Sequence, residues 1–428
     1  MKNSITEPPG SRLAEQAPQL KKLPKESSVT LVTPSPVMDS AVPAYRSVDD
    51  MVHELRPEMP VYCLRPSTIA ATAKLFLKQF PGDVLYAVKT NPDPRVLRYL
   101  AQAGVKHYDV ASIAEVKLVA EHLPDAKMYF MHPVKSREAI AAAYFDYGVR
   151  DFSLDTVEEL HKIMEVTGQA DDLNLFVRLA ISNEKAAYSL SGKFGIAPEH
   201  AQLLMQATRQ SANRLGVCFH VGSQCMDPDA YLQAVRVVTD LLEQSGVSLD
   251  ILDIGGGFPS IYPGMTPPAL GQYMKAIKKA IKSSPLLGGC QIICEPGRAL
   301  VAEGGSTVAR VEARKGNMLY LNEGVYGSLF DAGTPGFLFP VKAIRPDAQS
   351  GALSQELVEF GFYGPTCDSL DTMKGPFMLP DNIAEGDWIE VGQLGSYGFT
   401  MRTQFNGFHS DTTVEVNDKP LLSVLGVN

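Results

Sequence analysis

From residue 60 onward, short hydrophobic runs alternate with longer amphipathic stretches. The first five runs begin 21 to 24 residues apart, which leaves room for one helix and two short loops, and the later spacings are longer. Short apolar runs bounded by turn residues are typical of buried strands. The runs are Val84–Lys89, His107–Ala111, Met128–Met131, Phe152–Asp155, Leu173–Leu179, Gly216–Gly222, Ile251–Gly256 and Gln291–Gly297.

The stretches between these runs have the period of helices. Residues 112–122 place Ile113, Val116 and Val119 on one face, and residues 229–244 repeat apolar residues at i, i+3 and i+4. Eight such units predict an α/β fold in which a closed parallel (β/α)8 TIM barrel spans residues 60–304. An open, doubly wound sheet is the alternative.

The pattern changes after residue 305. Strand-like segments separated by Gly and Pro turns follow one another at 306–314, 318–322, 357–362 and 388–391, without helices between them. They predict a mostly antiparallel β-sandwich or β-barrel domain made of residues 44–59 and 305–428. The segment 61–64 fits either domain. Residues 1–43 hold seven prolines and no period, which predicts a flexible N-terminal tail.

Composition narrows the class of protein. With 428 residues, of which 45% are hydrophobic, the chain can bury a large core, and a net charge of −9 argues against a nucleic-acid-binding surface. The sequence has no signal-peptide pattern and no apolar run long enough to cross a membrane, so we expect a cytoplasmic protein. Its six cysteines form no CxxC pair and no metal-binding spacing with histidine, which favours free thiols and no metal.

Polar residues gather where the predicted strands end, the place where (β/α)8 barrels carry their chemistry. Singly, each residue there has an ordinary explanation, such as a solvated lysine or a tight turn. Together they form one coherent set. Its members are Lys89, Asp109, Arg178, His220, Ser223, Gly255, Gly256, Gly257, Glu295, Gly297 and Arg298.

This set favours an anionic ligand that also carries a carbonyl. Residues 255–257 can bring bare backbone N–H groups close to a phosphate. Lys89 can attack a carbonyl once burial or neighbouring cations depress its pKa. Glu295 can pair with a ring nitrogen. A phosphate, an aldehyde and a basic ring nitrogen together describe pyridoxal 5'-phosphate.

At this point the sequence resembles a known family, the fold-type III pyridoxal-phosphate decarboxylases that act on ornithine, lysine, diaminopimelate or arginine. The resemblance runs from about residue 45 to the C-terminus, and its last two stretches are most like eukaryotic-type ornithine decarboxylases. The matching stretches are YAVKTN (86–91), YDVAS (108–112), HVGSQC (220–225), LDIGGGFP (252–259), CEPGRALVA (294–302), GVYGS (324–328), YGPTCDSLD (363–371) and FNGF (405–408).

The resemblance implies a role for each residue that binds the cofactor. Lys89 matches the lysine that forms a Schiff base, His220 the histidine that stacks on the pyridine ring, and Glu295 the carboxylate that keeps its nitrogen protonated. Three residues match the polar network beside the lysine: Asp109, Glu115 and Arg178. Five residues match those around the phosphate, Ser223, Gly257, Gly297, Arg298 and Tyr397, and Gly255 and Gly256 belong to the same glycine-rich loop.

The resemblance also implies residues that act on the substrate. Cys367 matches the cysteine that reprotonates the substrate after CO2 leaves, and Asp368 the carboxylate that receives the distal ammonium, with Tyr326 close by. In the family Cys367 and Asp368 come from the other subunit, so a homodimer with shared active sites is implied. The segment after Ser328 is shorter than in ornithine decarboxylases. Asp331, the candidate second carboxylate, falls a few residues early and equally fits a turn.

We therefore expect decarboxylation of ornithine to putrescine, with lysine (giving cadaverine) as a possible second substrate, in polyamine biosynthesis. One alternative is decarboxylation of diaminopimelate or a modified basic amino acid, although the Cys367-Asp368 pair argues against diaminopimelate. The other alternative is a non-catalytic regulatory homologue, but such proteins tend to lose the cofactor residues that this chain keeps.

Overall fold

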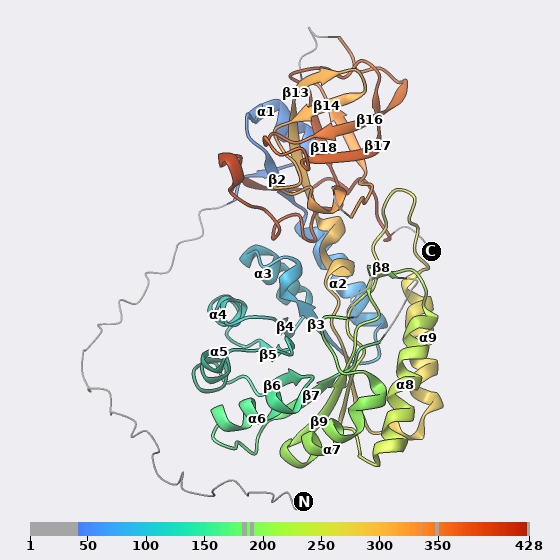
Figure 1. Cartoon of the computed structure of the whole chain (residues 1–428). Coiled ribbons are helices and arrows are strands. Elements are labelled where there is room, and N and C mark those ends of the chain that lie inside the picture. The colour runs from blue at the N-terminus through green and yellow to red at the C-terminus, as the bar shows by residue number, and fades with distance from the viewer. Residues whose placement is uncertain (1–41, 182–185, 189–191, 334, 347–350, 426–428) are drawn as a thin grey trace, which may run out of the picture. The chain divides into compact units, whose positions relative to one another are not determined.

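The structure is a computed structural model that describes residues 42–181, 186–188, 192–333, 335–346 and 351–425, so nearly all of the predicted tail lies outside the described residues. Residues 42–428 form one compact unit. Within it, one group of elements forms a barrel and the other forms a separate sheet (Figure 1).

Eight parallel strands close into a barrel because the last strand, β12, pairs with the first, β3. This closure confirms the (β/α)8 prediction and excludes the open sheet. Each predicted run overlaps one of these strands, which are β3 (Asp83–Ala87), β4 (His107–Val110), β5 (Lys127–Phe130), β6 (Asp151–Leu154), β7 (Asn174–Arg178), β9 (Arg214–Cys218), β11 (Ile251–Asp253) and β12 (Gln291–Cys294).

Helices cover the outside of the barrel (Figure 1). Several begin at a residue whose side chain accepts a backbone N–H of the first turn, as Ser112, Ser136 and Thr156 do. The helices are α2 (Pro66–Gln79), α3 (Pro94–Ala103), α4 (Ile113–His122), α5 (Arg137–Ala141), α6 (Val157–Val166), α7 (Ala201–Ser211), α8 (Asp229–Ser245), α9 (Leu270–Ser283) and the short α10 (Arg298–Val301).

The remaining strands form a nine-stranded, mostly antiparallel sheet, as predicted, with α1 (Val48–Leu55) beside it. A separate short pair, β8 (Ala186–Tyr188) and β10 (Ser223–Cys225), extends from the barrel loops. The strands of the large sheet are β1 (Ala44–Tyr45), β2 (Val61–Leu64), β13 (Gly305–Lys315), β14 (Met318–Leu321), β15 (Val341–Ile344), β16 (Leu357–Tyr363), β17 (Thr372–Pro380), β18 (Trp388–Val391) and β19 (Thr413–Val416).

Strand β2 corrects the predicted boundary at residue 60. It pairs with β13 and β19 of the large sheet and not with any barrel strand, so the barrel's strands begin only at Asp83. The sequence pattern did not reveal β15, β17 or β19. In β17 the pair Gly375-Pro376 interrupts the run, and such residues normally argue against a strand.

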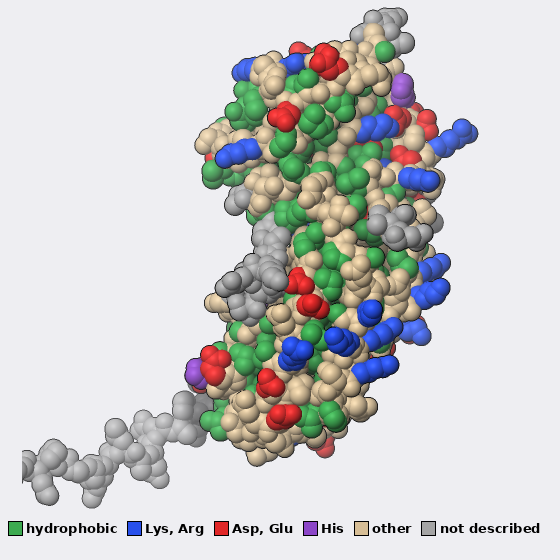
Figure 2. All heavy atoms as spheres, turned by 90° about the vertical axis from the view of Figure 1, so that its right-hand side faces the viewer, with side chains coloured by type: hydrophobic (Ala, Val, Ile, Leu, Met, Phe, Trp, Pro, Cys, Tyr) green, Lys and Arg blue, Asp and Glu red, His purple; other side chains and the backbone are tan. Residues whose placement is uncertain are grey.

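The surface carries charges of both signs. Helix α9 alone contributes four exposed lysines, Lys275, Lys278, Lys279 and Lys282. Figure 2 views the molecule from the side of α8 and α9, and Lys and Arg side chains gather on one part of that face. Among the described residues, no helix is both long and apolar enough to cross a membrane.

A buried arginine joins the barrel to the large sheet. Arg65 precedes α2, is 1% exposed, and donates hydrogen bonds to Ser306 (2.9 Å), Glu390 (2.7 Å) and Asp418 (2.9 Å). Glu390 is equally buried. The buried charges of Arg65 and Glu390 therefore compensate each other, and Asp418 adds a partly exposed carboxylate to the network.

We expect Arg65→Met to lower the free energy of unfolding by about 3–5 kcal/mol, because it leaves the Glu390 carboxylate buried and unpaired. Urea denaturation followed by the fluorescence of the single tryptophan, Trp388, measures the change. The control is Arg137→Met, which removes a solvent-exposed ion pair with Glu165 and should cost less than about 1 kcal/mol. Equal losses in the two variants would contradict the role of burial.

Candidate active site

A cavity of about 680 Å³ opens at the C-terminal ends of the barrel strands, within the size range of small-molecule sites. Loops of the large-sheet domain also line it, through Phe330, Pro335 and Met401. The predicted site residues that line this cavity are Lys89, Asp109, Arg178, His220, Ser223, Gly257, Glu295, Gly297, Arg298, Asp331 and Tyr397.

Lys89 lies in a short turn directly after β3, and its side chain, 47% exposed, reaches the cavity. Its Nζ is 3.1 Å from a carboxylate oxygen of the buried Asp109. Asp109 raises the pKa of Lys89 and outweighs the opposite effect of burial, with Glu295 and Tyr397 adding to the rise. The neighbours of Lys89 thus shift its pKa upward, opposite to the depression that attack on a carbonyl calls for.

A second carboxyl lies behind this pair. Ser112 caps α4 by accepting the N–H of Glu115, and Glu115 in turn accepts the N–H of Ala111 at 2.7 Å. Burial raises the pKa of Glu115, and the neighbouring Asp109 acts in the same direction. Glu115 does not line the cavity, and its hydrogen bonds join it to Ala111 and Ser112.

His220 follows β9 and lines the cavity. Its Nδ1 accepts the N–H of Gly222 at 2.9 Å, so the neutral ring carries its proton on Nε2. Burial, then Arg178 and Lys89, hold the pKa of His220 well below its usual value. An uncharged imidazole can lie against the face of a cationic aromatic ring without repulsion.

The triple glycine lets the loop after β11 pass beside this histidine. Gly255 and Gly256 do not line the cavity, but a Cβ at Gly256 would lie 3.0 Å from His220 Nε2, and one at Gly255 would overlap the carbonyl of Phe219. Gly257 reaches the cavity with φ +97°, a conformation that suits glycine. The glycines thus let backbone approach the cavity closely.

Glu295, after β12, is 4% exposed, and its Oε1 accepts no hydrogen bond from any described residue. Burial, followed by the charges of Asp253 and Asp109, raises the pKa of Glu295 well above its usual value. A buried acceptor without a donor has a free-energy cost that a ligand N–H group would remove. The carboxyl therefore suits a protonated ring nitrogen.

Arg298 supplies the positive charge on the anion-binding side. It donates to the hydroxyl of Tyr262 at 2.7 Å and to Asp331 at 3.3 Å, while its buried Nε has no partner among the described residues. The ring of Tyr397 lies 5.1 Å from the guanidinium carbon. Tyr262 could not be predicted as a partner of Arg298, because a tyrosine in a loop has no motif of its own.

Three predicted residues lie elsewhere. Tyr326, Cys367 and Asp368 do not line the cavity and lie on the large-sheet domain. Tyr326 donates to Asp368 and packs against Phe405, with ring centroids 4.9 Å apart; Cys367 contacts Asn406 through its backbone N–H (3.2 Å) and its thiol (3.3 Å). We call these five residues the β-domain cluster.

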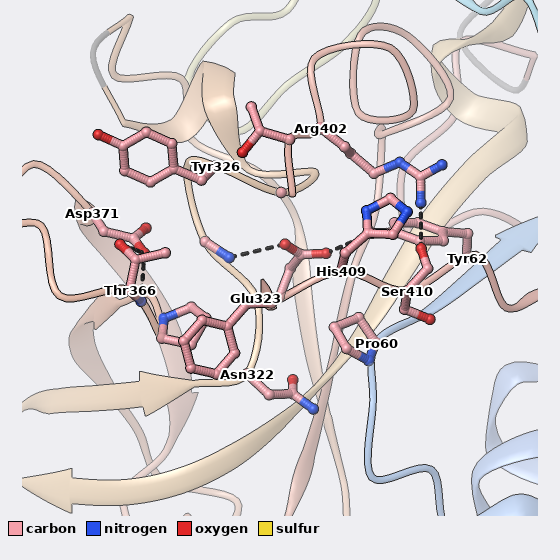
Figure 3. A pocket seen from close by; sticks show the side chains of 15 residues that line it. Pro60, Tyr62, Asn322, Glu323, Tyr326, Thr366, Asp371, Arg402, His409 and Ser410 are labelled. Carbon is pink, nitrogen blue, oxygen red and sulfur yellow. Dashed lines mark hydrogen bonds between the residues drawn. The ribbon is translucent and has the colours of Figure 1, made fainter. Parts of the chain in front are cut away.

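Beside this cluster lies a small pocket, and hydrogen bonds between its lining residues hold the loops that carry the cluster (Figure 3). Asp371 accepts hydrogen bonds from the backbone of Val325 (2.8 Å) and from the hydroxyl of Thr366 (2.7 Å), so it ties the two loops together. Glu323 accepts the hydroxyl of Tyr62 at 3.0 Å. With a volume of about 10 Å³, the pocket holds a single water at most. Its role is structural.

Comparisons with known proteins agree with this geometry. Residues 67–302, the barrel, match the family model "Pyridoxal-dependent decarboxylase, pyridoxal binding domain". The chain is 34% identical to a lysine/ornithine decarboxylase of Selenomonas ruminantium (79% of this chain, 84% of the relative) and 33% identical to an ornithine decarboxylase of Panagrellus redivivus (85% and 87%). The chain belongs to the pyridoxal-dependent decarboxylases. A solved lysine/ornithine decarboxylase of Vibrio vulnificus, complexed with putrescine, superposes with a TM-score of 0.74 at 29% identity, covering 86% of this chain and 97% of that one.

The decarboxylase thus uses pyridoxal phosphate, and the cavity fits this group. Lys89 offers an amine for the aldehyde, Glu295 an unpaired acceptor for the ring nitrogen, and Arg298 an unpaired N–H for the phosphate. Gly257 leaves room for close approach, because a Cβ there would lie 2.5 Å from the carbonyl oxygen of Gly222.

Asp109 should set the pH dependence of cofactor capture. Only an uncharged amine attacks the aldehyde, and Asp109 is the main cause of the raised pKa of Lys89. The rate of cofactor capture should increase as the pH rises, and in Asp109→Asn we expect this increase at a lower pH than in the wild type. The rate at which the visible band of the bound cofactor appears in apoenzyme measures this. Asp151→Asn is the control. Asp151 is the first residue of β6 and pairs with Lys127. An unshifted Asp109→Asn profile would contradict the pairing.

Proposed function

We propose that this decarboxylase converts L-ornithine to putrescine and, as a second reaction, L-lysine to cadaverine, in polyamine biosynthesis in the cytoplasm. The observation that carries the proposal is the position of Asp331, which lines the same cavity as Lys89. A diamino acid held beside Lys89 would then have a carboxylate within the same cavity for its distal ammonium. The similarity to lysine/ornithine decarboxylases supports the same substrate class.

Bound pyridoxal phosphate would supply an aldehyde for the substrate amine and a ring that accepts the electron pair left on the substrate carbon when CO2 departs. Glu295 keeps a proton at the ring nitrogen, which strengthens this acceptance. His220, uncharged, supports the ring face without competing for the proton. Asp109 holds the released lysine amine close to the cavity for the return step.

The reacting carbon then needs a proton, and we assign its delivery to Cys367 of a second copy of the chain. The β-domain cluster carries a thiol, a carboxylate and a phenol side by side, yet none of the three lines the cavity of its own chain. Phe405 of the cluster is 40% exposed, and the apolar Leu370, two residues after Asp368, is 74% exposed. In a homodimer in which each cluster completes the partner's cavity, the thiol, the carboxylate and the phenol would contact the substrate bound there.

One cation at the cavity wall favours a second candidate substrate. Lys193 also lines the cavity, and a lysine suits the distal carboxylate of diaminopimelate. Two carboxylates, Asp331 and Asp368, argue the other way. Comparison of kcat/KM for meso-diaminopimelate and ornithine on the wild-type enzyme separates the two candidates, and a preference for meso-diaminopimelate would overturn the proposal.

The carboxylate of Asp331 should matter only for substrates with a distal ammonium. In Asp331→Asn, kcat/KM for ornithine and lysine should fall about tenfold to a hundredfold, the size of a lost charge-assisted hydrogen bond. The residual kcat/KM for norleucine, which lacks the ammonium, should stay within about twofold. The assays use saturating cofactor, so that weaker cofactor binding through a less well positioned Arg298 does not lower the measured rate. An equal fall of kcat/KM for lysine and norleucine would show that Asp331 only positions Arg298 and does not bind the distal ammonium.

Mixed dimers test the shared site. Lys89→Ala and Cys367→Ala should each be nearly inactive, but refolding them together should restore about a quarter of wild-type activity, because half of the dimers are mixed and each mixed dimer has one intact site. The matched control mixes Lys89→Ala with Glu295→Ala, whose changes fall in the same cavity, and no activity should return. Absence of rescue in the first mixture would rule out sharing.

A further inference from the structure

Thr90 stands directly after Lys89 and has no assigned role. It is 1% exposed, lines the cavity, and its hydroxyl has no hydrogen-bond partner among the described residues. We propose that the Thr90 hydroxyl is a further hydrogen-bond donor to the phosphate group of the cofactor. The inference rests on the proposed phosphate position beside Gly297 and Arg298 and is independent of which amino acid is the substrate.

The position of the hydroxyl supports this assignment. A Cβ built on Gly297 would lie 2.0 Å from Thr90 Oγ1, so the backbone of Gly297 runs directly against the hydroxyl and only glycine fits there. Arg298, the next residue in the chain, has a buried Nε without a partner among the described residues. The Thr90 hydroxyl thus lies against the backbone that directly precedes the cation that we assign to the phosphate.

The backbone of Thr90 is fixed from the opposite side as well. Its carbonyl accepts the N–H of Tyr397 at 2.9 Å, and Tyr397 lines the cavity with its ring near Arg298. Asn91 adds a second tie, since its side chain donates to the carbonyl of Gly395 at 2.9 Å. The turn that carries Thr90 is therefore held between two loops of the proposed phosphate site.

A buried hydroxyl without a partner has a free-energy cost, which an acceptor supplied by a ligand removes. Phosphate oxygens are strong acceptors, and hydrogen bonds to charged groups are stronger than neutral ones. The β-branched side chain of threonine has few rotamers, so its hydroxyl is well positioned before the ligand arrives. The matching apolar residue, valine, has the same shape without the donor.

The test compares two ligands on apoenzyme. Thr90→Val should weaken binding of pyridoxal phosphate roughly tenfold to a hundredfold, and binding of pyridoxal, which lacks the phosphate, should stay within about twofold. The matched control is Thr307→Val. Thr307 in β13 has a buried, unpartnered hydroxyl of the same kind but does not line the cavity, so neither ligand should be affected.

Thermal unfolding of the apoenzyme provides a second measurement. Because the variant removes an unpaired hydroxyl, Thr90→Val without ligand should be as stable as the wild type or more stable, whereas inorganic phosphate should raise its melting temperature less. Equal weakening of both ligands would make Thr90 a structural residue and overturn the proposal, as would unchanged binding of pyridoxal phosphate. The variant Arg298→Ala tests the position of the phosphate separately from the role of Thr90. If this variant also keeps the wild-type preference for pyridoxal phosphate over pyridoxal, the phosphate site itself is misplaced.

Discussion

Pairing between the last barrel strand and the first is the constraint on which the site depends. The register of β12 against β3 sets Cys294 beside Val84, and the N–H of Ala87 reaches the carbonyl of Pro296 at 3.2 Å. Residues separated by some two hundred positions in the chain thereby become neighbours. Without this closure, Lys89 and Glu295 would lie at opposite edges of an open sheet, and no single molecule could meet both.

Electrostatics then decides how the assembled groups behave. The cavity combines acids and bases at close range and excludes much of the water, so each charge depends on its neighbour. Asp109 keeps Lys89 charged, whereas burial and nearby cations keep His220 neutral. The shift is in the opposite direction to that of His220 at Glu295, where burial and two neighbouring aspartates raise the pKa of the carboxyl. The pKa values of these three side chains are thus shifted for different physical reasons.

The sequence predicts the barrel well because strand period, helix period and spacing are local signals that agree. The residues at strand ends follow from the fold, and most of them line the cavity. What the sequence misses is set by tertiary contact. No periodicity places β2 in the large sheet, reveals that Tyr262 holds Arg298, or shows that a carboxylate at 3.1 Å outweighs burial at Lys89. Cys367 and Asp368 form a motif that the sequence detects, but its distance from the cavity of the same chain appears only in three dimensions.

The separation of the β-domain cluster from the cavity has a consequence for how the enzyme behaves on dilution. A chain that bears both halves of a proposed shared site, but keeps them apart, has all the reacting groups and no assembled site while it is alone. Specific activity would then depend on protein concentration, and it would fall once the concentration drops below the dissociation constant of the pair. Anything that covers the loops around Asp371 and Glu323 would act on the enzyme as dilution does, without touching the cofactor.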